Sequence, residues 1–246
     1  MSAEPLRLAF GNTAADYERG RADWPDAVAE VGGVPPKAEV LDLAAGTGKL
    51  TRVLARRFAR VTAVEPNDSM RALCGQVTQC CLEGSAEAIP LGDGSVEAVF
   101  CGDAFHWFDW PAALGEIGRV LRPRGTLVLA WNIPAGDTEP AFPQEAWDVI
   151  HRYRRPGVEP GGPIYESGAW REPFAGSAFG PLRQTAIDHE YVQDRDRVVA
   201  ETLSVSIFAA LPPQERVAMA AELHATVPDV IYRTPFRAEV WWTRLR

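Results

Sequence analysis

Short apolar runs alternate with amphipathic segments between residues 39 and 131, and this alternation constrains the fold more than any other feature of the sequence. The runs 39–44, 61–66, 79–84, 96–103 and 126–131 have the length and apolar content of buried strands. The segments 50–58, 67–75 and 111–121 have the residue spacing or the terminal residues of helices. Such alternation predicts a parallel sheet with helices on both faces.

The alternation ends near residue 132, where the sequence becomes rich in proline and glycine. The stretch 133–178 contains one expected helix, 143–153, and we interpret it as a lid or substrate insertion. Further strands are expected at 182–193 and 236–245, with helices at 194–210 and 213–226 between them.

These elements predict an α/β fold: a seven-stranded Rossmann-like sheet with helices on both faces and a small helical cap or lid. Residues 13–31 are expected to be helical. The expected segments are an N-terminal cap arm (1–36), a ligand-binding core (37–132), the lid or substrate insertion (133–178), and the C-terminal part of the core sheet with helices (179–246). We expect the cap to consist of the arm and the lid.

The composition is that of an ordinary globular protein, and it narrows the range of partners. A formal net charge of −8 repels a phosphate backbone and argues against nucleic acid. The basic stretch "HRYRRP" (151–156) is either a local basic patch or a solvated helix end. No apolar run reaches the roughly 20 residues of a membrane span. The N-terminus shows no secretion signal, so we expect no membrane partner and a cytoplasmic location.

The four cysteines are Cys74, Cys80, Cys81 and Cys101, and they form no C-x-x-C pair. A zinc site is therefore not expected, and we predict that the protein needs no metal. We interpret the cysteines as free, mostly buried thiols of a reducing compartment.

The stretch "LDLAAGTGKL" (41–50) has the glycine spacing of a nucleotide-binding loop, and two common loop types fit it poorly. A Walker loop needs a glycine where Leu43 stands and a hydroxyl residue where Leu50 stands. A dinucleotide loop needs a third glycine at the position of Thr51, and its pyrophosphate would be repelled by Asp42.

S-adenosylmethionine suits the loop better, because this ligand carries an ammonium and a sulfonium and has no phosphate. Asp42 can bind the ammonium, while Gly46 and Gly48 let the backbone approach the ligand. Glu65, 23 residues after Asp42, stands at the end of the next strand and can accept both ribose hydroxyls. On this interpretation Lys49 only begins a helix and keeps its charge in solvent.

Several segments together carry a resemblance to a known family: "VLDLAAGTGKLT", "VTAVEPNDSM", "EGSAEAIPLGDGSVEAVF", "FHWFDW" and "EIGRVLRPRGTLVLAWN". Over about half of its length, the chain resembles the class I S-adenosylmethionine-dependent methyltransferases of the "methyltransferase 11" type. The front segment "FGNTAADYERGRADWP" resembles the cap of a bacterial subgroup related to trans-aconitate methyltransferases.

The resemblance implies a set of cofactor contacts. Ser85 stands where relatives often have an acid that meets the adenine amine, and Ala86 would offer its backbone N–H to the ring. Met70 would lie against the adenine face or be a core methionine, and Arg21 would pair with the cofactor carboxylate or form a surface salt bridge. The implied contacts are Tyr17, Arg21, Asp42, Ala44, Gly46, Gly48, Glu65, Pro66, Met70, Ser85, Ala86, Glu87, Cys101 and Gly102.

Methyl transfer is an in-line displacement that depends mainly on alignment, and a base is needed only when the nucleophile starts protonated. His106, after the fourth strand, is the candidate base or orienting donor, with a structural histidine as the alternative. Phe105 and Trp107 either line the pocket or belong to the core. Asp103 and Asp109 are expected to be loop or helix-cap residues.

Aromatic and basic residues of the lid and the arm suggest an aromatic or anionic small substrate. The candidate substrate residues are Trp24, Phe105, Trp107, His151, Tyr165 and Trp170. We expect methyl transfer to O, S or N of a small molecule, such as a natural-product thiol, phenol or carboxylate, with S-adenosylhomocysteine as the product. The alternatives are a non-catalytic cofactor-binding module and an NAD(P)-dependent reductase. A monomer or a homodimer is expected.

Overall fold

The structure is a computed structural model that describes residues 13–136, 142–155 and 165–246. The expected arm before residue 13 and the lid stretches 137–141 and 156–164 lie outside the described residues.

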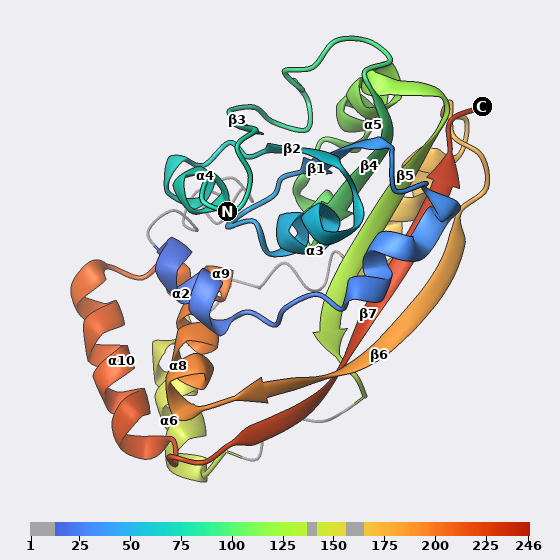
Figure 1. The fold of residues 1–246 in the computed structure, drawn as a ribbon. Coiled ribbons are helices and arrows are strands. Elements are labelled where there is room, and N and C mark those ends of the chain that lie inside the picture. Colours follow the sequence, from blue (N-terminus) through green and yellow to red (C-terminus); the bar gives the residue numbers. More distant parts are fainter. Residues whose placement is uncertain (1–12, 137–141, 156–164) are drawn as a thin grey trace.

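A seven-stranded sheet forms the centre of the fold, with the order β3-β2-β1-β4-β5-β7-β6 (Figure 1). The strands are β1 (Glu39–Leu43), β2 (Arg60–Val64), β3 (Cys81–Leu82), β4 (Val96–Gly102), β5 (Leu121–Pro134), β6 (Arg183–Gln193) and β7 (Tyr232–Arg244). The first five are parallel, and β7 runs antiparallel to both β5 and β6. The predicted α/β fold with seven strands is confirmed.

Both faces of the sheet are covered by other elements. Alternate residues of β4 point to opposite sides of the sheet and show what covers each face. Ala98 and Phe100 pack in one apolar cluster with the helix α3 (Lys49–Arg57) and the 3-10 segment η2 (Asp26–Gly33). Val99 and Cys101 pack in another cluster with the helix α5 (Trp110–Val120) and the 3-10 segment η4 (Ala169–Phe174). The parallel strands are therefore buried on both sides, as their apolar sequence predicts.

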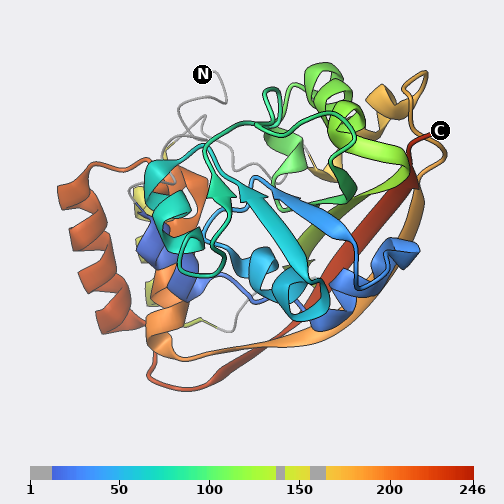
Figure 2. The ribbon, with the colours of Figure 1, turned by 45° about the horizontal axis from the view of Figure 1, so that its top comes forward.

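Helices gather at one end of the sheet and form the cap (Figures 1 and 2). They are α2 (Ala14–Gly20), α6 (Gln144–Tyr153), α8 (Arg195–Ser204), α9 (Ser206–Ala209) and α10 (Pro213–Thr226). Residues of α6, α8, α9 and α10, among them Val149, Val198, Phe208 and Leu223, share an apolar cluster separate from those of the sheet. The cap is therefore larger than expected, since residues 195–226 contribute to it as well as the arm and the lid.

Several predicted boundaries differ from those of the structure. The expected helix 13–31 ends at Gly20, and Arg21 is already extended, with a φ of −77° and a ψ of 143°. A 3-10 segment follows Pro25 at Asp26–Gly33. The expected helix 194–210 is interrupted at Val205, whose φ of −64° and ψ of 134° are extended. The third strand comprises two residues rather than the six of 79–84.

Candidate active site

Three of the five residues that follow β1 have a left-handed backbone conformation. Ala44, Gly46 and Gly48 have φ values of 57°, 58° and 89°. A Cβ at Gly48 would lie 3.2 Å from the Cα of Cys74, so this glycine lets α3 and α4 (Asp68–Cys74) approach closely. Among the described residues, a Cβ at Gly46 would meet only the sulfur of Met70, at 3.9 Å, so this part of the structure leaves space for a ligand beside the glycine.

Asp42 is buried below this loop and has one unused carboxylate oxygen. The Thr51 hydroxyl donates to its Oδ2 at 2.5 Å, while Oδ1 has no hydrogen-bond partner among the described residues. Burial raises the pKa of this carboxyl to about 7, and the hydrogen bond from Thr51 partly offsets the rise. A buried oxygen without a donor favours a ligand that brings one, such as an ammonium group.

Glu65, directly after β2, holds the loop from the neighbouring strand. Its Oε2 accepts the N–H of Gly46 at 2.8 Å and its Oε1 accepts the N–H of Asn67 at 2.9 Å. Burial raises its pKa, and these two backbone hydrogen bonds oppose the rise. Each carboxylate oxygen keeps further lone pairs, so the group can still accept ligand hydroxyls.

The other residues expected near an adenine flank this loop. Met70 is buried on α4, beside the open space at Gly46, and the carbonyl oxygen of Pro66 accepts a hydrogen bond from Arg71. Ser85 forms a β-bridge to Ala88, and Ala86 is buried. The side chain of Glu87 accepts the N–H of Asp109 and so connects this loop to the start of α5.

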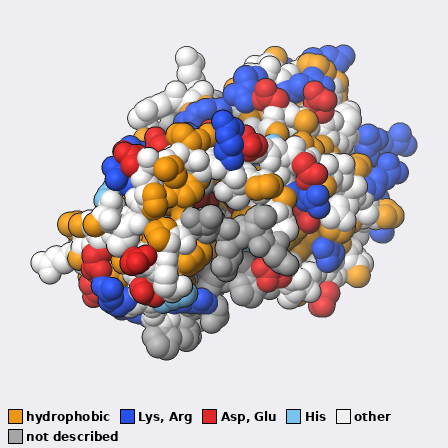
Figure 3. All heavy atoms as spheres, turned by 90° about the horizontal axis from the view of Figure 1, so that it is seen from below, with side chains coloured by type: hydrophobic (Ala, Val, Ile, Leu, Met, Phe, Trp, Pro, Cys, Tyr) orange, Lys and Arg blue, Asp and Glu red, His pale blue; other side chains and the backbone are white. Residues whose placement is uncertain are grey.

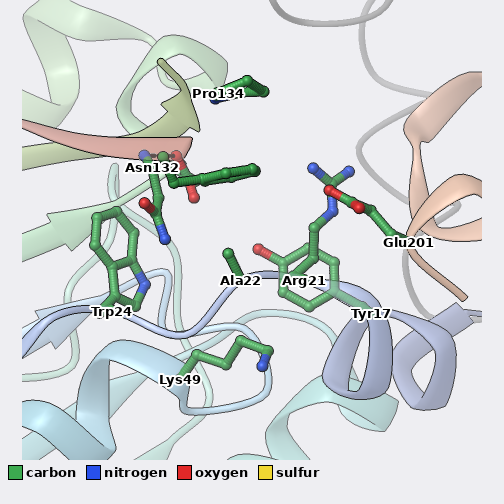
Figure 4. A pocket seen from close by; sticks show the side chains of 10 residues that line it. Tyr17, Arg21, Ala22, Trp24, Lys49, Asn132, Pro134 and Glu201 are labelled. Atoms are coloured by element: carbon green, nitrogen blue, oxygen red, sulfur yellow. Dashed lines mark hydrogen bonds between the residues drawn. The ribbon is translucent and has the colours of Figure 1, made fainter. Parts of the chain in front are cut away.

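A pocket of about 560 Å³, including its open mouth, lies between the end of β4, the arm and α8 (Figure 4). It is lined by Tyr17, Arg21, Ala22, Trp24, Lys49, Asp103, Asn132, Pro134, Glu201 and Phe236. Figure 4 shows Arg21 and Glu201 together on one side and Trp24 with Asn132 on the other. Cations, acids and aromatic rings thus face the same space.

Arg21 connects the arm to α8 at the pocket and lies over the ring of Tyr17. The Nε of Arg21 donates to the Ser204 hydroxyl at 2.9 Å, and its guanidinium carbon lies 5.5 Å from the centre of the Tyr17 ring. Burial raises the pKa of Tyr17 to about 12, with Asp103 adding to the rise, so the phenol is neutral at physiological pH.

Lys49 corrects the expectation of a solvent-exposed charge. The residue is buried, and its Nζ lies 2.7 Å from the Oδ1 of Asp23 in the arm. The ion pair joins the first residue of α3 to the arm and places the ammonium beside the pocket.

Asp103 is a pocket residue rather than a helix cap, whereas Asp109 caps α5 by accepting the N–H of Ala112. The φ of Asp103 is 52°, in the left-handed region that residues other than glycine seldom adopt. Its Oδ1 accepts the N–H of Asn132 at 2.9 Å. Burial raises its pKa to about 6, and Asn132 and Arg21 partly offset the rise.

His106 lies outside the residues that line the pocket and accepts a hydrogen bond from a tryptophan. The Nε1–H of Trp131 donates to its Nδ1 at 3.2 Å. Burial lowers the pKa of His106 to about 4, so the ring is neutral and carries its proton on Nε2. Such a ring can donate a hydrogen bond from Nε2, but it is a weak base.

Of the six residues expected to meet the substrate, Trp24 lines the pocket. Phe105 and Trp170 are buried in the sheet core, where their rings lie 6.2 Å apart, so they act as core residues. Tyr165 stacks on Trp131 and donates to Glu239. Trp107 packs beside His106, and His151 is exposed on α6 and stacks on Trp147.

Gly102 and Cys101 end β4 at the floor of this region. A Cβ at Gly102 would lie 2.8 Å from the Trp24 ring, so the glycine lets the indole pack directly on the strand. Cys101 and Cys74 are buried as expected, and burial raises the pKa of both thiols, whereas Cys80 is exposed.

Sequence reasoning missed the polar residues that the fold brings to the pocket from distant segments, namely Lys49, Asp103, Asn132 and Glu201. Asn132 directly follows the predicted fifth strand, a position that could have indicated the site. Asp103 likewise ends the predicted fourth strand and Lys49 lies in the glycine loop, whereas Glu201 carried no local signal. The stretch "HRYRRP" supplies ion pairs within the cap: Arg152 to Glu222 and Arg155 to Glu215.

The surface seen from below in Figure 3 mixes basic, acidic and hydrophobic side chains around a hollow.

Where the structure describes the chain, it contains no helix with the length and apolar character of a membrane span.

Comparison with known proteins identifies the family. Residues 41–129 match the family described as a methyltransferase domain. An uncharacterized methyltransferase-like protein of Schizosaccharomyces pombe is 35% identical over 241 residues, which are 93% of this chain and 91% of that protein. The chain belongs to the class I S-adenosylmethionine-dependent methyltransferases.

Further comparisons agree with this assignment. The methyltransferase is 38% identical over 177 residues to an uncharacterized methyltransferase of Mycobacterium tuberculosis, which covers 70% of this chain and 68% of the relative. A structure assigned as a type II methyltransferase from Anaeromyxobacter dehalogenans has a TM-score of 0.61 at 20% identity and covers 92% of this chain and 98% of that one. This likeness confirms the fold, while the narrower trans-aconitate resemblance stays a prediction.

The cofactor of the methyltransferase is S-adenosylmethionine, and the edge of the sheet fits it. The buried Oδ1 of Asp42 needs a donor, and the cofactor carries an ammonium. The space beside Gly46 is open, and Glu65 has lone pairs left for hydroxyls.

Proposed function

We propose that this methyltransferase moves a methyl group to an oxygen, sulfur or nitrogen atom of a small molecule. The pocket beside Asp103 is the observation that carries the proposal. It is a concave space at the end of β4 into which aromatic and charged side chains converge, as they do in small-molecule sites. Its aromatic walls, Trp24 and Phe236, and its charged groups suit an aromatic or polar acceptor.

We further propose that two carboxylates bind opposite parts of the cofactor. Asp42 would face the ammonium and Glu65 the ribose hydroxyls, with the backbone of Ala44, Gly46 and Gly48 close to the ligand. The adenine end would contact Pro66, Met70, Ser85, Ala86 and Glu87, and the methionine end Cys101, Gly102, Tyr17 and Arg21.

When bound, S-adenosylmethionine supplies a methyl carbon that a positively charged sulfur activates. The chain's own residues orient the acceptor and exclude water, and alignment of this kind lowers a barrier by as much as about 7–11 kcal/mol. Trp24 packs on Gly102 and closes one side of the pocket, while Tyr17 and Arg21 close another. The Nε2–H of His106 is an orienting donor in this proposal.

Two measurements test the proposed function. Calorimetry with S-adenosylhomocysteine should show binding, and the absence of binding at millimolar ligand would contradict the assignment of the site. Transfer from a methyl-labelled donor should then be measured against small thiols, phenols, amines and carboxylates and against a small-molecule metabolite extract. Binding without transfer to any of these would favour the non-catalytic module instead.

A further inference from the structure

The carboxyl group of Asp103 is fixed at the pocket by two hydrogen bonds between this residue and the neighbouring strand β5. Its backbone N–H donates to the carbonyl of Ala130 at 2.9 Å, and its Oδ1 accepts the N–H of Asn132 at 2.9 Å. Both partners lie on β5, so the left-handed residue is held against the strand that flanks β4. Among the described residues, no hydrogen-bond donor is assigned to Oδ2.

The other charged groups of the pocket are engaged with protein partners. Lys49 is paired with Asp23, and Arg21 donates to Ser204. Glu201 accepts a hydrogen bond from Gln193 at 2.6 Å. Asp103 differs from Glu201 in standing at the end of β4, where its hydrogen bonds to β5 fix the carboxyl and leave Oδ2 as an acceptor for a polar atom of a ligand.

We propose that Asp103 is the general base of methyl transfer and that the acceptor enters with a proton on its nucleophilic atom, as a thiol, a phenol or an amine. This inference rests on the proposed function and narrows it. A carboxylate acceptor is already ionised and would need no base, so such an acceptor would leave Asp103 without a role.

The proton and the electrons balance in a single step. The lone pair of the acceptor atom forms the bond to the methyl carbon as the bond from that carbon to sulfur breaks, and sulfur keeps that electron pair. The acceptor proton moves to Oδ2 of Asp103, which later releases it to solvent through the open mouth of the pocket.

The electrostatics of the site favour this role at neutral pH. Burial places the pKa of Asp103 at about 6, nearer to neutrality than that of an ordinary aspartate, so the group is both ionised and more basic at pH 7. The charged and titratable groups around it are Tyr17, Arg21, Lys49, Cys101, Tyr165 and Glu201. Tyr17, Cys101 and Tyr165 have raised pKa values and stay neutral, and Arg21 lowers the pKa of Asp103.

The test compares D103N with D109N in the full-length chain. Asparagine also tolerates a left-handed backbone, so D103N should fold, and D109N keeps a helix-capping side chain outside the pocket. Methyl transfer is measured to four probes of similar size: benzenethiol, phenol, benzylamine and benzoate. Calorimetry with S-adenosylhomocysteine and thermal unfolding are measured in parallel.

We expect D103N to lower transfer to benzenethiol, phenol or benzylamine by about 10²–10⁴-fold, with affinity for S-adenosylhomocysteine within about twofold of wild type. The wild-type rate should rise with pH through about 6, and this limb should disappear in D103N. D109N should keep both the wild-type rate and its rise with pH.

Three outcomes would overturn the inference. They are unchanged transfer by D103N, loss of S-adenosylhomocysteine affinity in parallel with the rate, and transfer by the wild type to benzoate alone. In the last case the protein would still methylate a small molecule, as proposed, but the reaction would need no general base.

A readout that needs no acceptor completes the test. ¹³C-aspartate NMR of the protein bound to S-adenosylhomocysteine should show a carboxyl that titrates near pH 6 and is missing in D103N. An Asp103 carboxyl with the ordinary pKa of about 4 would contradict the inference even if no probe is methylated. Failure of transfer to every probe and to a metabolite extract would instead contradict the proposed function.

Discussion

The cofactor loop and the acceptor pocket lie at the same edge of the sheet, but they are assembled over very different distances in the sequence. Glu65 reaches the loop at Gly46, 19 residues away, whereas Arg21 reaches Ser204, 183 residues away. The first site follows from adjacent strands and their loops. The second exists only after the arm and α8 have packed together, so its composition cannot be read from local patterns.

The largest expected effect is on the free energy of unfolding, and it tests whether α2 is stabilised by packing against α8. A Cβ at Gly20 would lie 2.1 Å from the backbone nitrogen of Glu201, and backbone atoms cannot move aside cheaply. G20A should therefore lower the unfolding free energy by about 3 kcal/mol, at the upper end of overpacking effects. Chemical denaturation measures this.

The matched control is G115A, because no atom of the described residues lies within 4 Å of a Cβ at that helical glycine. G115A should stabilise the protein by about 0.4–1 kcal/mol. Equal effects of the two substitutions would show that α2 does not rest on α8.

The next effect concerns the cofactor side alone. E65A removes the acceptor for the N–H groups of Gly46 and Asn67 and for the proposed ribose hydroxyls. Affinity for S-adenosylhomocysteine should fall by about 1.5–3 kcal/mol in calorimetry. E83A, at a well-exposed glutamate after β3, is the control. Unchanged affinity in E65A would mean that the ribose is held elsewhere.

The pH dependence of stability should reveal the buried acid below the loop. The folded pKa of Asp42, about 7, lies above the ordinary value of 3.8, so its contribution is fully present at low pH and is lost as pH rises toward 7. D42N cannot ionise. The unfolding free energy of D42N minus that of wild type should therefore grow by on the order of 2 kcal/mol from pH 5 to pH 8.

Denaturation series at several pH values measure this difference, with D93N, at an exposed carboxylate, as the reference. A difference that stays flat with pH would show that the Asp42 carboxyl is not desolvated in the free protein.

The smallest effect is spectroscopic and concerns His106. Because Trp131 donates to its Nδ1, the ring should remain a neutral Nε2–H tautomer from pH 6 to pH 8 in ¹⁵N NMR. W131F removes that donor and should allow the other tautomer to appear. A wild-type ring that gains a proton in this range would make His106 a candidate base and weaken the case for Asp103.

The sequence predicted the sheet and the cofactor loop because strands, glycines and acids mark them locally. The positions of the parallel strands, the cap-type start of α4 at Asn67 and the helical face of Leu50, Val53 and Leu54 were predictable. Asp23 was not recognisable as the partner of Lys49, since the pair forms only when the arm crosses α3. The sequence around Trp170 does not show that the residue is buried, because the three aromatic rings that cover it come from distant segments.

The apolar cluster shared by α6, α8, α9 and α10 has an evolutionary consequence. Helices that stabilise one another can diverge with little effect on the sheet, so descendants of one ancestral enzyme can change the molecules they modify while retaining their methyl donor. A combinatorial library confined to the cap, selected on new acceptors, would follow the same route in the laboratory.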